Sequence, residues 1–382
     1  MGPGHRTRAR RGVRTGVVHR VAAPPGAAGE AAGESVFSGP VGRYVSLVRA
    51  VVQDRYASPE TLRVREVPTP VAGDGEVLVR VRAASVHPDV WHVVTGRPYV
   101  LRLMGAGLRR PKNRIPGTDV AGDVVAVGAS VTRFRPGDEV FGETTMGHQW
   151  LNGGAFAEYV PVPQDALARK PGSVTFEQAA AVPTSGLLAL NNLPRKHLRS
   201  GQRVLVNGAG GGVGGFAVQL AKAHGATVTG VDAAMKLAMV TSLGADRVID
   251  YAREDFTQGG ERYDLIFDVP GNHSFAECRR VLAPGGTYVW IGHDRFGAAA
   301  GRWLGSVPHG LRLVVMSRFV PQLPTVTFSR PGKKDLMAAL AGLLEAGKLT
   351  PVVDRTFPLS EVPQALQYLQ EGRAQGRIVI TV

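Results

Sequence analysis

A glycine-rich segment in the middle of the chain limits the possible folds more than any other feature. Residues 204–222 read VLVNGAGGGVGGFAVQLAK: a short apolar run, a run of glycines and an amphipathic run. This order is typical of a buried strand, a tight loop and a helix. The backbone of such a loop and the helix N-terminus can approach a pyrophosphate closely, which predicts a dinucleotide site of Rossmann type. The residues predicted to bind it are Gly208, Ala209, Gly210, Gly211, Gly212, Val213 and Gly214.

The same segment carries a prediction about the cofactor. Ala209, Gly211 and Gly214 stand at the three fingerprint positions, with alanine in place of the first glycine. Asp232 follows about 20 residues after Gly211, where a carboxylate can bind the adenosine ribose diol. A carboxylate there repels a 2′-phosphate, so NAD is favoured over NADP, whereas Lys236 one turn later could neutralise that phosphate. The predicted preference for NAD is therefore modest, and Asp232 as a plain helix N-cap stays an alternative.

The chain beyond residue 172 alternates between strand and helix patterns. Such alternation predicts an α/β fold with a doubly wound parallel sheet covered on both faces, placed at 172–325. The expected strands are 204–206, 227–231, 247–250, 265–268 and 287–291, and the expected helices are 213–224, 235–243 and 275–282.

The preceding part of the chain has a different texture. Apolar and polar residues alternate with period two from Val48 onward, which predicts a β-rich domain over 47–171. Its expected strands are 48–54, 62–67, 76–83, 122–128 and 155–160. The last part, 326–382, is expected to form helices at 335–345 and 362–370 and a closing strand at 377–382.

Residues 1–46 consist largely of Gly, Ala, Pro and Arg, which cannot bury enough apolar surface to offset the entropy of ordering. They are predicted to be a disordered extension, and the working protein is predicted to begin near Val48. Removing them should leave stability and turnover unchanged.

Composition excludes several classes of protein. Cys278 is the single cysteine, so an internal disulfide and any zinc site with two or more thiolates are excluded. The chain has no run of 18 or more apolar residues, which predicts no membrane partner, and a cytoplasmic location is expected. The formal charge of +14 lacks an accompanying aromatic and basic platform, so a nucleic-acid partner is not expected either.

Missing motifs exclude further chemistry. No tyrosine is followed four residues later by lysine, so the acid–base pair of short-chain dehydrogenases is absent. No HExxH, GxSxG or Walker A sequence occurs, which argues against a zincin, an α/β-hydrolase and a P-loop NTPase.

Five further segments carry a family resemblance. They read AASVHPDVW at 83–91, IPGTDVAG at 115–122, FRPGDEVF at 134–141, AVPTSG at 181–186 and LGADRVIDY at 243–251. With the glycine loop, they make residues 48–382 resemble the medium-chain dehydrogenase/reductase superfamily, in its zinc-free, quinone oxidoreductase-like branch. The resemblance implies a GroES-like catalytic domain, a Rossmann domain inserted into it, an active-site cleft between them and a homodimer.

The resemblance also bears on zinc. Zinc-dependent relatives place a cysteine near Ser85, a histidine within the segment that here reads GTD at 117–119, and four cysteines in a structural lobe. This chain has none of them, so no metal ligands and no zinc are expected.

The resemblance implies roles for particular residues. His87 stands where zinc-free relatives commonly have asparagine, and it is a candidate to donate a proton or hydrogen bond to substrate. The implied catalytic set is His87, Trp91, His92 and Thr184, and further cofactor contacts are expected from Thr184, Tyr251, Gly292, His293 and Arg373. The alternatives are that Trp91 belongs to the core and that His92, Tyr251 and Arg373 are ordinary surface residues.

Chemistry then narrows the reaction. Oxidising a simple alcohol requires stabilising an alkoxide, which zinc or a tyrosine–lysine pair normally does. Hydride addition to a conjugated enone or a quinone delocalises the charge onto a distant oxygen, which a few fixed donors can hold. The sequence therefore predicts zinc-independent hydride transfer from NAD(P)H to a quinone or an α,β-unsaturated carbonyl. A metal-independent alcohol dehydrogenase or aldehyde reductase is the alternative, and a structural or nucleic-acid-binding role like that of zeta-crystallin is a third.

Overall fold

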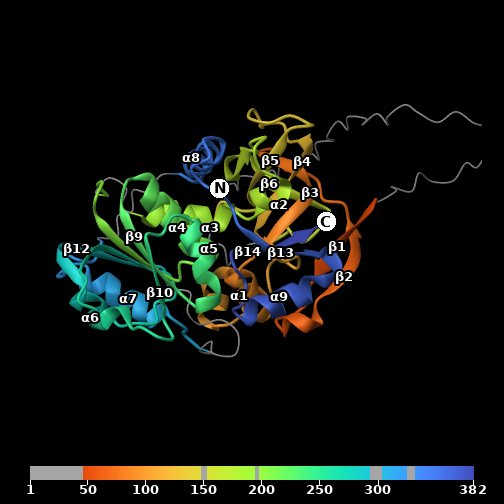
Figure 1. The fold of residues 1–382 in the computed structure, drawn as a ribbon. Coiled ribbons are helices and arrows are strands. Elements are labelled where there is room, and N and C mark those ends of the chain that lie inside the picture. Colours follow the sequence, from red (N-terminus) through yellow and green to blue (C-terminus); the bar gives the residue numbers. More distant parts are fainter. Residues whose placement is uncertain (1–45, 148–152, 194–197, 293–302, 325–331) are drawn as a thin grey trace, which may run out of the picture. The chain divides into compact units, whose positions relative to one another are not determined.

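A five-stranded parallel sheet organises the middle of the chain, as predicted. The computed structural model describes residues 46–147, 153–193, 198–292, 303–324 and 332–382, which belong to one unit of the chain (Figure 1). The strands lie in the order β10 (Arg247–Asp250), β9 (Thr227–Asp232), β8 (Arg203–Asn207), β11 (Tyr263–Asp268) and β12 (Leu282–Trp290). From β8 the chain continues to β9 and β10 on one side of the sheet. It then returns to the other side of β8, where β11 and β12 follow. The carboxyl ends of β8 and β11 therefore form the topological switch point at which such sheets bind ligands.

Alternate residues of β8 enter two different cores. Val204 and Val206 pack in a core with α3 (Pro183–Asn192) and α4 (Gly212–Ala223), whereas Leu205 packs in a core with α6 (Phe275–Arg280) and α7 (Val307–Met316). The short apolar run that predicts this strand is thus buried on both faces of the sheet. The helix expected at 235–243 begins later, because Ala234–Lys236 forms a 3-10 turn before α5 (Leu237–Ser242).

The GroES-like part is a second sheet of seven strands. The strands in order are β13 (Val353–Pro358), β14 (Arg377–Thr381), β3 (Glu76–Val86), β4 (Asp119–Val127), β5 (Glu139–Glu143) and β7 (Leu167–Arg169), with β6 (Tyr159–Pro163) paired to β3. A separate hairpin joins β1 (Leu47–Val52) to β2 (Arg63–Pro68). Four helices complete this part: α1 (Pro88–Thr95), α2 (Phe176–Ala180), α8 (Lys333–Glu345) and α9 (Val362–Gln370).

The strand predicted at 155–160 is wrong over most of its length. The backbone of Ala155 and Phe156 donates to the carbonyls of Gly117 and Pro116 instead, and Ala157 makes only an isolated bridge to Ala50. β6 begins at Tyr159. Ala155, Phe156 and Ala157 are all buried, so the expected alternation is absent at the start of this segment, which pairs with a loop.

The last strand, β14, pairs with a strand from the first part of the GroES-like sheet. β14 runs antiparallel to β3, with Val379 opposite Ser85 and Ile378 opposite Val86. The first residue of β14, Arg377, is therefore held close to the end of β3 and the start of α1. One buried cluster also includes Phe141 of the GroES-like sheet, Leu187 of α3 and Leu340 of α8, so the two sheets share a core.

The predicted extension, 1–46, lies outside the described residues except for its last residue, and the predicted domain boundaries stay predictions. Among the helices of the described ranges, none is long and apolar enough to cross a membrane.

Candidate active site

A cavity of about 270 Å³ lies at the switch point of the parallel sheet. Its wall combines the glycine loop after β8, the end of β9, the start of α1, the first turns of α3 and the segment that leads into β14. Its lining includes Val86, His87, Asp89, Thr184, Ser185, Leu188, Gly208, Gly211, Gly212, Val213, Asp232, Lys236, Val269, Gly376 and Arg377. Residues from both sheets therefore face one space, as expected for a cleft enzyme.

The glycine loop is held tightly against the last part of the chain. Gly208 has φ +79°, a backbone conformation that favours glycine. A Cβ at Gly212 would lie 2.5 Å from Arg377 Cδ and 2.7 Å from Ser185 Oγ, so a side chain at this position has no room. The Gly376 N–H donates to the Gly210 carbonyl at 3.2 Å. These contacts explain why the loop needs glycine beyond the three fingerprint positions.

Asp232 ends β9 and supports the loop directly. Its Oδ2 accepts from the Gly210 N–H at 2.8 Å and its Oδ1 from the Ala233 N–H at 2.8 Å, with Lys236 Nζ 3.7 Å from Oδ1. The following 3-10 turn has Ala233 as its N-cap and no side-chain cap bond. Asp232 therefore does not act as the plain helix cap of the alternative interpretation, and ribose binding by Asp232 and Lys236 stays a prediction.

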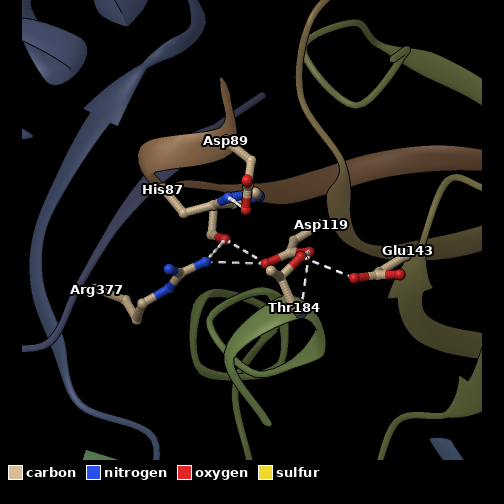
Figure 2. Close-up of polar contacts among 7 residues, drawn as sticks. His87, Asp89, Asp119, Glu143, Thr184 and Arg377 are labelled. Carbon is tan, nitrogen blue, oxygen red and sulfur yellow. Dashed lines mark hydrogen bonds and ion pairs between the residues drawn. The ribbon is translucent and has the colours of Figure 1, made fainter. Parts of the chain in front are cut away.

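His87 and Asp89 form a pair at the other end of the cavity. His87 is 1% exposed and precedes the first turn of α1, where Pro88 starts the helix. Asp89 Oδ2 lies 3.2 Å from His87 Nδ1 (Figure 2). Both ring nitrogens of His87 are buried and neither makes a hydrogen bond among the described residues, so Asp89 lies beside Nδ1 as a charge rather than as a directed acceptor. Sequence reasoning selected His87 and missed Asp89, although a carboxylate two residues later in a first helical turn was a usable signal.

A chain of buried polar side chains lies behind this pair. Arg377 Nη2 donates to Asp119 Oδ2 at 2.9 Å and to Ser85 Oγ at 2.7 Å, and Ser85 Oγ donates to Asp119 Oδ2 at 2.8 Å. Asp119 Oδ1 accepts from Thr184 Oγ1 at 2.5 Å (Figure 2). Burial lowers the pKa of the Arg377 guanidinium, and the Asp119 carboxylate opposes this shift. Arg377 is thus fixed against the wall of the cavity, with its Nε left without a hydrogen bond.

The chain continues through Thr184 to a second carboxyl group. Thr184 Oγ1 lies 2.8 Å from Glu143 Oε1, and Lys333 at the start of α8 pairs with Glu143 Oε2. Burial raises the pKa of Glu143, although the Lys333 ammonium opposes the shift. The Thr184 hydroxyl has a single proton, and Asp119 Oδ1 and Glu143 Oε1 share it as acceptors. Thr184 lines the cavity but its hydroxyl is directed into this chain.

The other predicted catalytic residues of α1 lie elsewhere. Trp91 is 3% exposed and belongs to the core of the GroES-like part. His92 Nδ1 contacts the Arg97 carbonyl at 2.6 Å. Neither residue is part of the cavity lining. The structure therefore brings His87 and Thr184 to the cavity and keeps Trp91 and His92 away from it.

Several predicted cofactor contacts are also outside the lining. Tyr251 is 59% exposed, and Arg373 pairs with Glu371 at the surface. Gly292 follows β12 and packs close to Trp290, and His293 lies outside the described residues. The roles of these residues stay predictions. Arg377 is the arginine of the C-terminal segment that lines the cavity. A basic residue at the start of an otherwise apolar strand is the sequence feature that could have indicated it.

A further buried carboxyl group, that of Asp268, stands at the switch point. Asp268 ends β11; its Oδ1 accepts from Asn207 Nδ2 and the Gly271 N–H at 2.9 Å, and its Oδ2 from Tyr288 Oη at 2.8 Å. These partners are all neutral, and burial raises the pKa of Asp268. Asn207 is the last residue of β8, so this network fixes the strand from which the glycine loop departs.

Within the part of the chain that the structure describes, no group of three or more His, Cys, Asp or Glu side chains could hold a metal ion.

Comparison with known proteins agrees with this geometry. The zinc-binding dehydrogenase family matches residues 243–380, and the alcohol dehydrogenase GroES-like domain family matches residues 73–172. A 2-methylene-furan-3-one reductase of Solanum lycopersicum is 33% identical over 85% of this chain and 76% of its own length. An NADPH-dependent alkenal/one oxidoreductase of Arabidopsis thaliana is 32% identical, covering 87% of this chain and 79% of its own.

Solved structures give the same result. The quinone oxidoreductase from Coxiella burnetii has a TM-score of 0.73 at 26% identity, covering 88% of this chain and all of its own. An NAD-dependent alcohol dehydrogenase has a TM-score of 0.70 at 30% identity, covering 87% of this chain and 99% of its own. The chain belongs to the medium-chain dehydrogenase/reductase superfamily. Within it, the protein is an NAD(P)H-dependent oxidoreductase of the quinone oxidoreductase and alkenal reductase type.

Proposed function

We propose that the protein reduces the carbon–carbon double bond of an α,β-unsaturated carbonyl compound, or a quinone, with NADH preferred modestly over NADPH and without a metal ion. One observation carries the proposal: the glycine loop and the His87–Asp89 pair line the same cavity. Leu188, Val213 and Val269 supply apolar wall between them, which suits an uncharged conjugated acceptor. The names of the relatives point to the same substrate classes.

The residues present fit a dinucleotide. Gly212 lets the loop backbone lie directly against Ser185 and Arg377, and the buried Ser185 Oγ and Arg377 Nε have no hydrogen-bond partner among the described residues. A pyrophosphate supplies acceptors for such donors at the N-terminus of α4. The Asp232 carboxylate at the end of β9 would accept from the ribose diol, and Lys236 would soften its repulsion of a 2′-phosphate.

Bound NADH supplies one hydride to the acceptor. Hydride addition at the β-carbon of an enone moves an electron pair onto the carbonyl oxygen, and one proton at the α-carbon completes the reduction. For a quinone, the hydride and one proton together give the hydroquinone. His87 is placed to hold that proton on its unpartnered Nε2, and Asp89 beside Nδ1 stabilises the imidazolium. His87 is then reprotonated from solvent.

The chain behind the pair acts as a support. Arg377 Nη2 and Thr184 Oγ1 both donate to Asp119, and Thr184 Oγ1 also contacts Glu143, so these hydrogen bonds hold both side chains in place beside the cavity. No alkoxide needs to form on the substrate, which is why the proposal assigns no role to zinc.

The test is cofactor oxidation measured with NADH and with NADPH against a panel of quinones, enals, enones and simple aldehydes. The proposal expects turnover of the conjugated acceptors, unchanged after dialysis against a metal chelator. Activity restricted to simple aldehydes or alcohols would instead establish the alcohol dehydrogenase alternative. Loss of activity on chelation would contradict the metal-free mechanism alone.

A further inference from the structure

Helix α7 presents an apolar stripe to solvent. Inside α7 the exposed members recur every three or four residues, at 307, 311, 314 and 315, so they share one side of the helix. Trp303, Leu304 and Phe319 lie in the turns that flank α7 and are also exposed. The exposed fractions run from 38% at Val307 to 83% at Phe319. The opposite side packs on the protein, through buried Leu313 and through Gly310 against Trp290. The stripe consists of Trp303, Leu304, Val307, Leu311, Val314, Val315 and Phe319.

A second exposed apolar segment adjoins the start of this stripe. Leu103, Met104 and Leu108 are 47% to 75% exposed. The preceding residues contact the stripe, since the Tyr99 and Trp303 rings stack edge to face with centroids 5.3 Å apart and the Val100 N–H donates to the Trp303 carbonyl at 3.0 Å. We call the stripe and this segment together the α7 face.

The two chain segments that form the α7 face contain arginines and lysines and no acidic residue. Residues 97–118 contain six arginines and lysines and no acidic residue, and residues 303–324 contain two arginines and no acidic residue. Two of these eight are engaged inside the protein: Arg102 bonds to the Gly96 carbonyl, and Arg114 pairs with Asp54. Among the described residues, no ion pair forms with the five exposed cations Arg109, Arg110, Lys112, Arg312 and Arg318.

We propose that the α7 face docks the protein onto the surface of an anionic lipid bilayer. Aliphatic and aromatic side chains on one side of a helix can enter the boundary between headgroups and acyl chains, while arginine and lysine pair with anionic headgroups. The sequence predicted no membrane partner because it has no spanning run. A peripheral site needs only the stripe and the charges, which residues far apart in sequence supply once folded.

Charge decides between the possible occupants. A second copy in a two-fold dimer would bring this face against itself, so its cations would meet cations with no acidic residue to pair them. A nucleic acid would satisfy the cations but leave Leu311, Val314 and Val315 against a polar backbone. An anionic bilayer complements both the charge and the apolar stripe.

The test is flotation of the full chain with vesicles of phosphatidylglycerol and phosphatidylcholine, and with vesicles of phosphatidylcholine alone. The wild type should float with the anionic vesicles only, and high salt should reduce its binding. Leu311→Glu should lower the partition coefficient about tenfold or more, since it replaces an inserting side chain by a like charge. Arg312→Gln with Arg318→Gln should lower it about tenfold and weaken the dependence on salt.

Val71→Glu is the matched control, since Val71 is an exposed apolar residue (85%) outside the α7 face. It should bind vesicles like the wild type, and all variants should keep wild-type turnover and thermal stability. Absence of wild-type flotation would overturn the proposal. So would a halved molecular mass of Leu311→Glu in solution, which would make the face a subunit interface. Binding of single-stranded DNA in place of vesicles, lost in the same variants, would also overturn it.

Discussion

The two ends of the cavity are built in different ways. At the glycine-loop end, consecutive backbone groups between β8 and α4 form the wall, with Asp232 on the next strand beside them. At the His87 end, side chains rest on the buried chain of Ser85, Asp119 and Arg377, in which bonded residues are up to 292 positions apart. One end is a local motif, and the other exists only when the whole chain is folded.

This difference determines what each end can tolerate. The loop end is limited by space, because its backbone approaches neighbouring side chains too closely for a Cβ. The His87 end is limited by charge, because a buried carboxylate needs its cation. Substitutions in the buried charged chain at the His87 end should therefore mainly lower the free energy of unfolding. Substitutions at the loop end should mainly weaken cofactor binding.

The largest effect is expected from Arg377→Met. The variant removes the cation from the fully buried Asp119 and leaves that charge with neutral donors only, which should cost about 3–5 kcal/mol of unfolding free energy. Urea unfolding measures the loss. The double variant Asp119→Asn with Arg377→Met should recover part of it, because the unpaired charge is gone. A single variant as stable as the wild type would mean that the chain does not hold the two halves of the site.

His87→Gln should lower kcat about a hundredfold with a conjugated acceptor, the usual contribution of a positioned proton donor. The Michaelis constant for the cofactor should change little, because the glycine loop is untouched. Asp89→Asn should lower kcat less, since it only weakens support of the imidazolium.

His92→Gln is the matched control for this prediction, since His92 is on the same helix but does not line the cavity. It should leave kcat nearly unchanged. Equal losses in both histidine variants would mean that α1 as a whole is needed, rather than the His87 side chain.

Gly212→Ala tests the space-limited end. The added Cβ would meet the buried Arg377 Cδ and Ser185 Oγ at less than van der Waals distance, so at least one of these neighbours has to shift. We expect about 1–3 kcal/mol of lost stability and a higher Michaelis constant for the cofactor. Gly172→Ala is the control, because a Cβ there meets nothing within 4 Å. If both variants behave alike, the loop has more freedom than the contacts allow.

The parts of the fold that the sequence predicted are those with a regular local pattern. β8 and β9 follow from short, mostly apolar runs that the sheet buries on both faces, and α4 follows from the amphipathic run after the glycines. Helix α7 was not predicted, because Pro308 resembles a helix breaker and the apolar side of the helix faces solvent rather than a core. Here Pro308 occupies the first turn, where a proline stabilises a helix.

The predicted site divides in the same way. The glycine loop, Asp232 and Lys236 lie within one short stretch, and they line the cavity together. Asp119, Glu143 and Arg377 were missed because their partners come from distant elements, and no local pattern specifies such a contact. The resemblance predicted that Arg373 is the arginine of the C-terminal segment that contacts the cofactor. The structure instead places Arg377, at the start of β14, beside Ser85 of β3.

Asp232→Ser should shift the balance of catalytic efficiency toward NADPH by about tenfold, mostly through the Michaelis constant for the cofactor. The carboxylate repels a 2′-phosphate, and its removal frees Lys236 to pair with that phosphate. Serine also loses one loop contact, the acceptor of the Gly210 N–H, so both cofactors should bind somewhat more weakly. An unmoved ratio of NADH to NADPH efficiency would show that Asp232 only supports the loop.

The smallest effect is expected from Asp268→Asn, and it concerns pH. Asparagine can keep the Oδ1 contacts with Asn207 and Gly271, and its Nδ2 can donate to Tyr288 Oη, although the Tyr288 hydroxyl then no longer donates to residue 268. Burial raises the folded-state pKa of Asp268, so the stability that this group contributes is complete below its unfolded pKa of about 3.9 and is lost as pH rises through the folded value. The neutral amide has no such loss. Urea unfolding from mildly acidic to neutral pH should therefore show the variant gaining on the wild type as pH rises. If the variant instead becomes less stable than the wild type as pH rises, the charged Asp268 carboxylate stabilises the switch point. That result would contradict the expectation from its neutral hydrogen-bond partners.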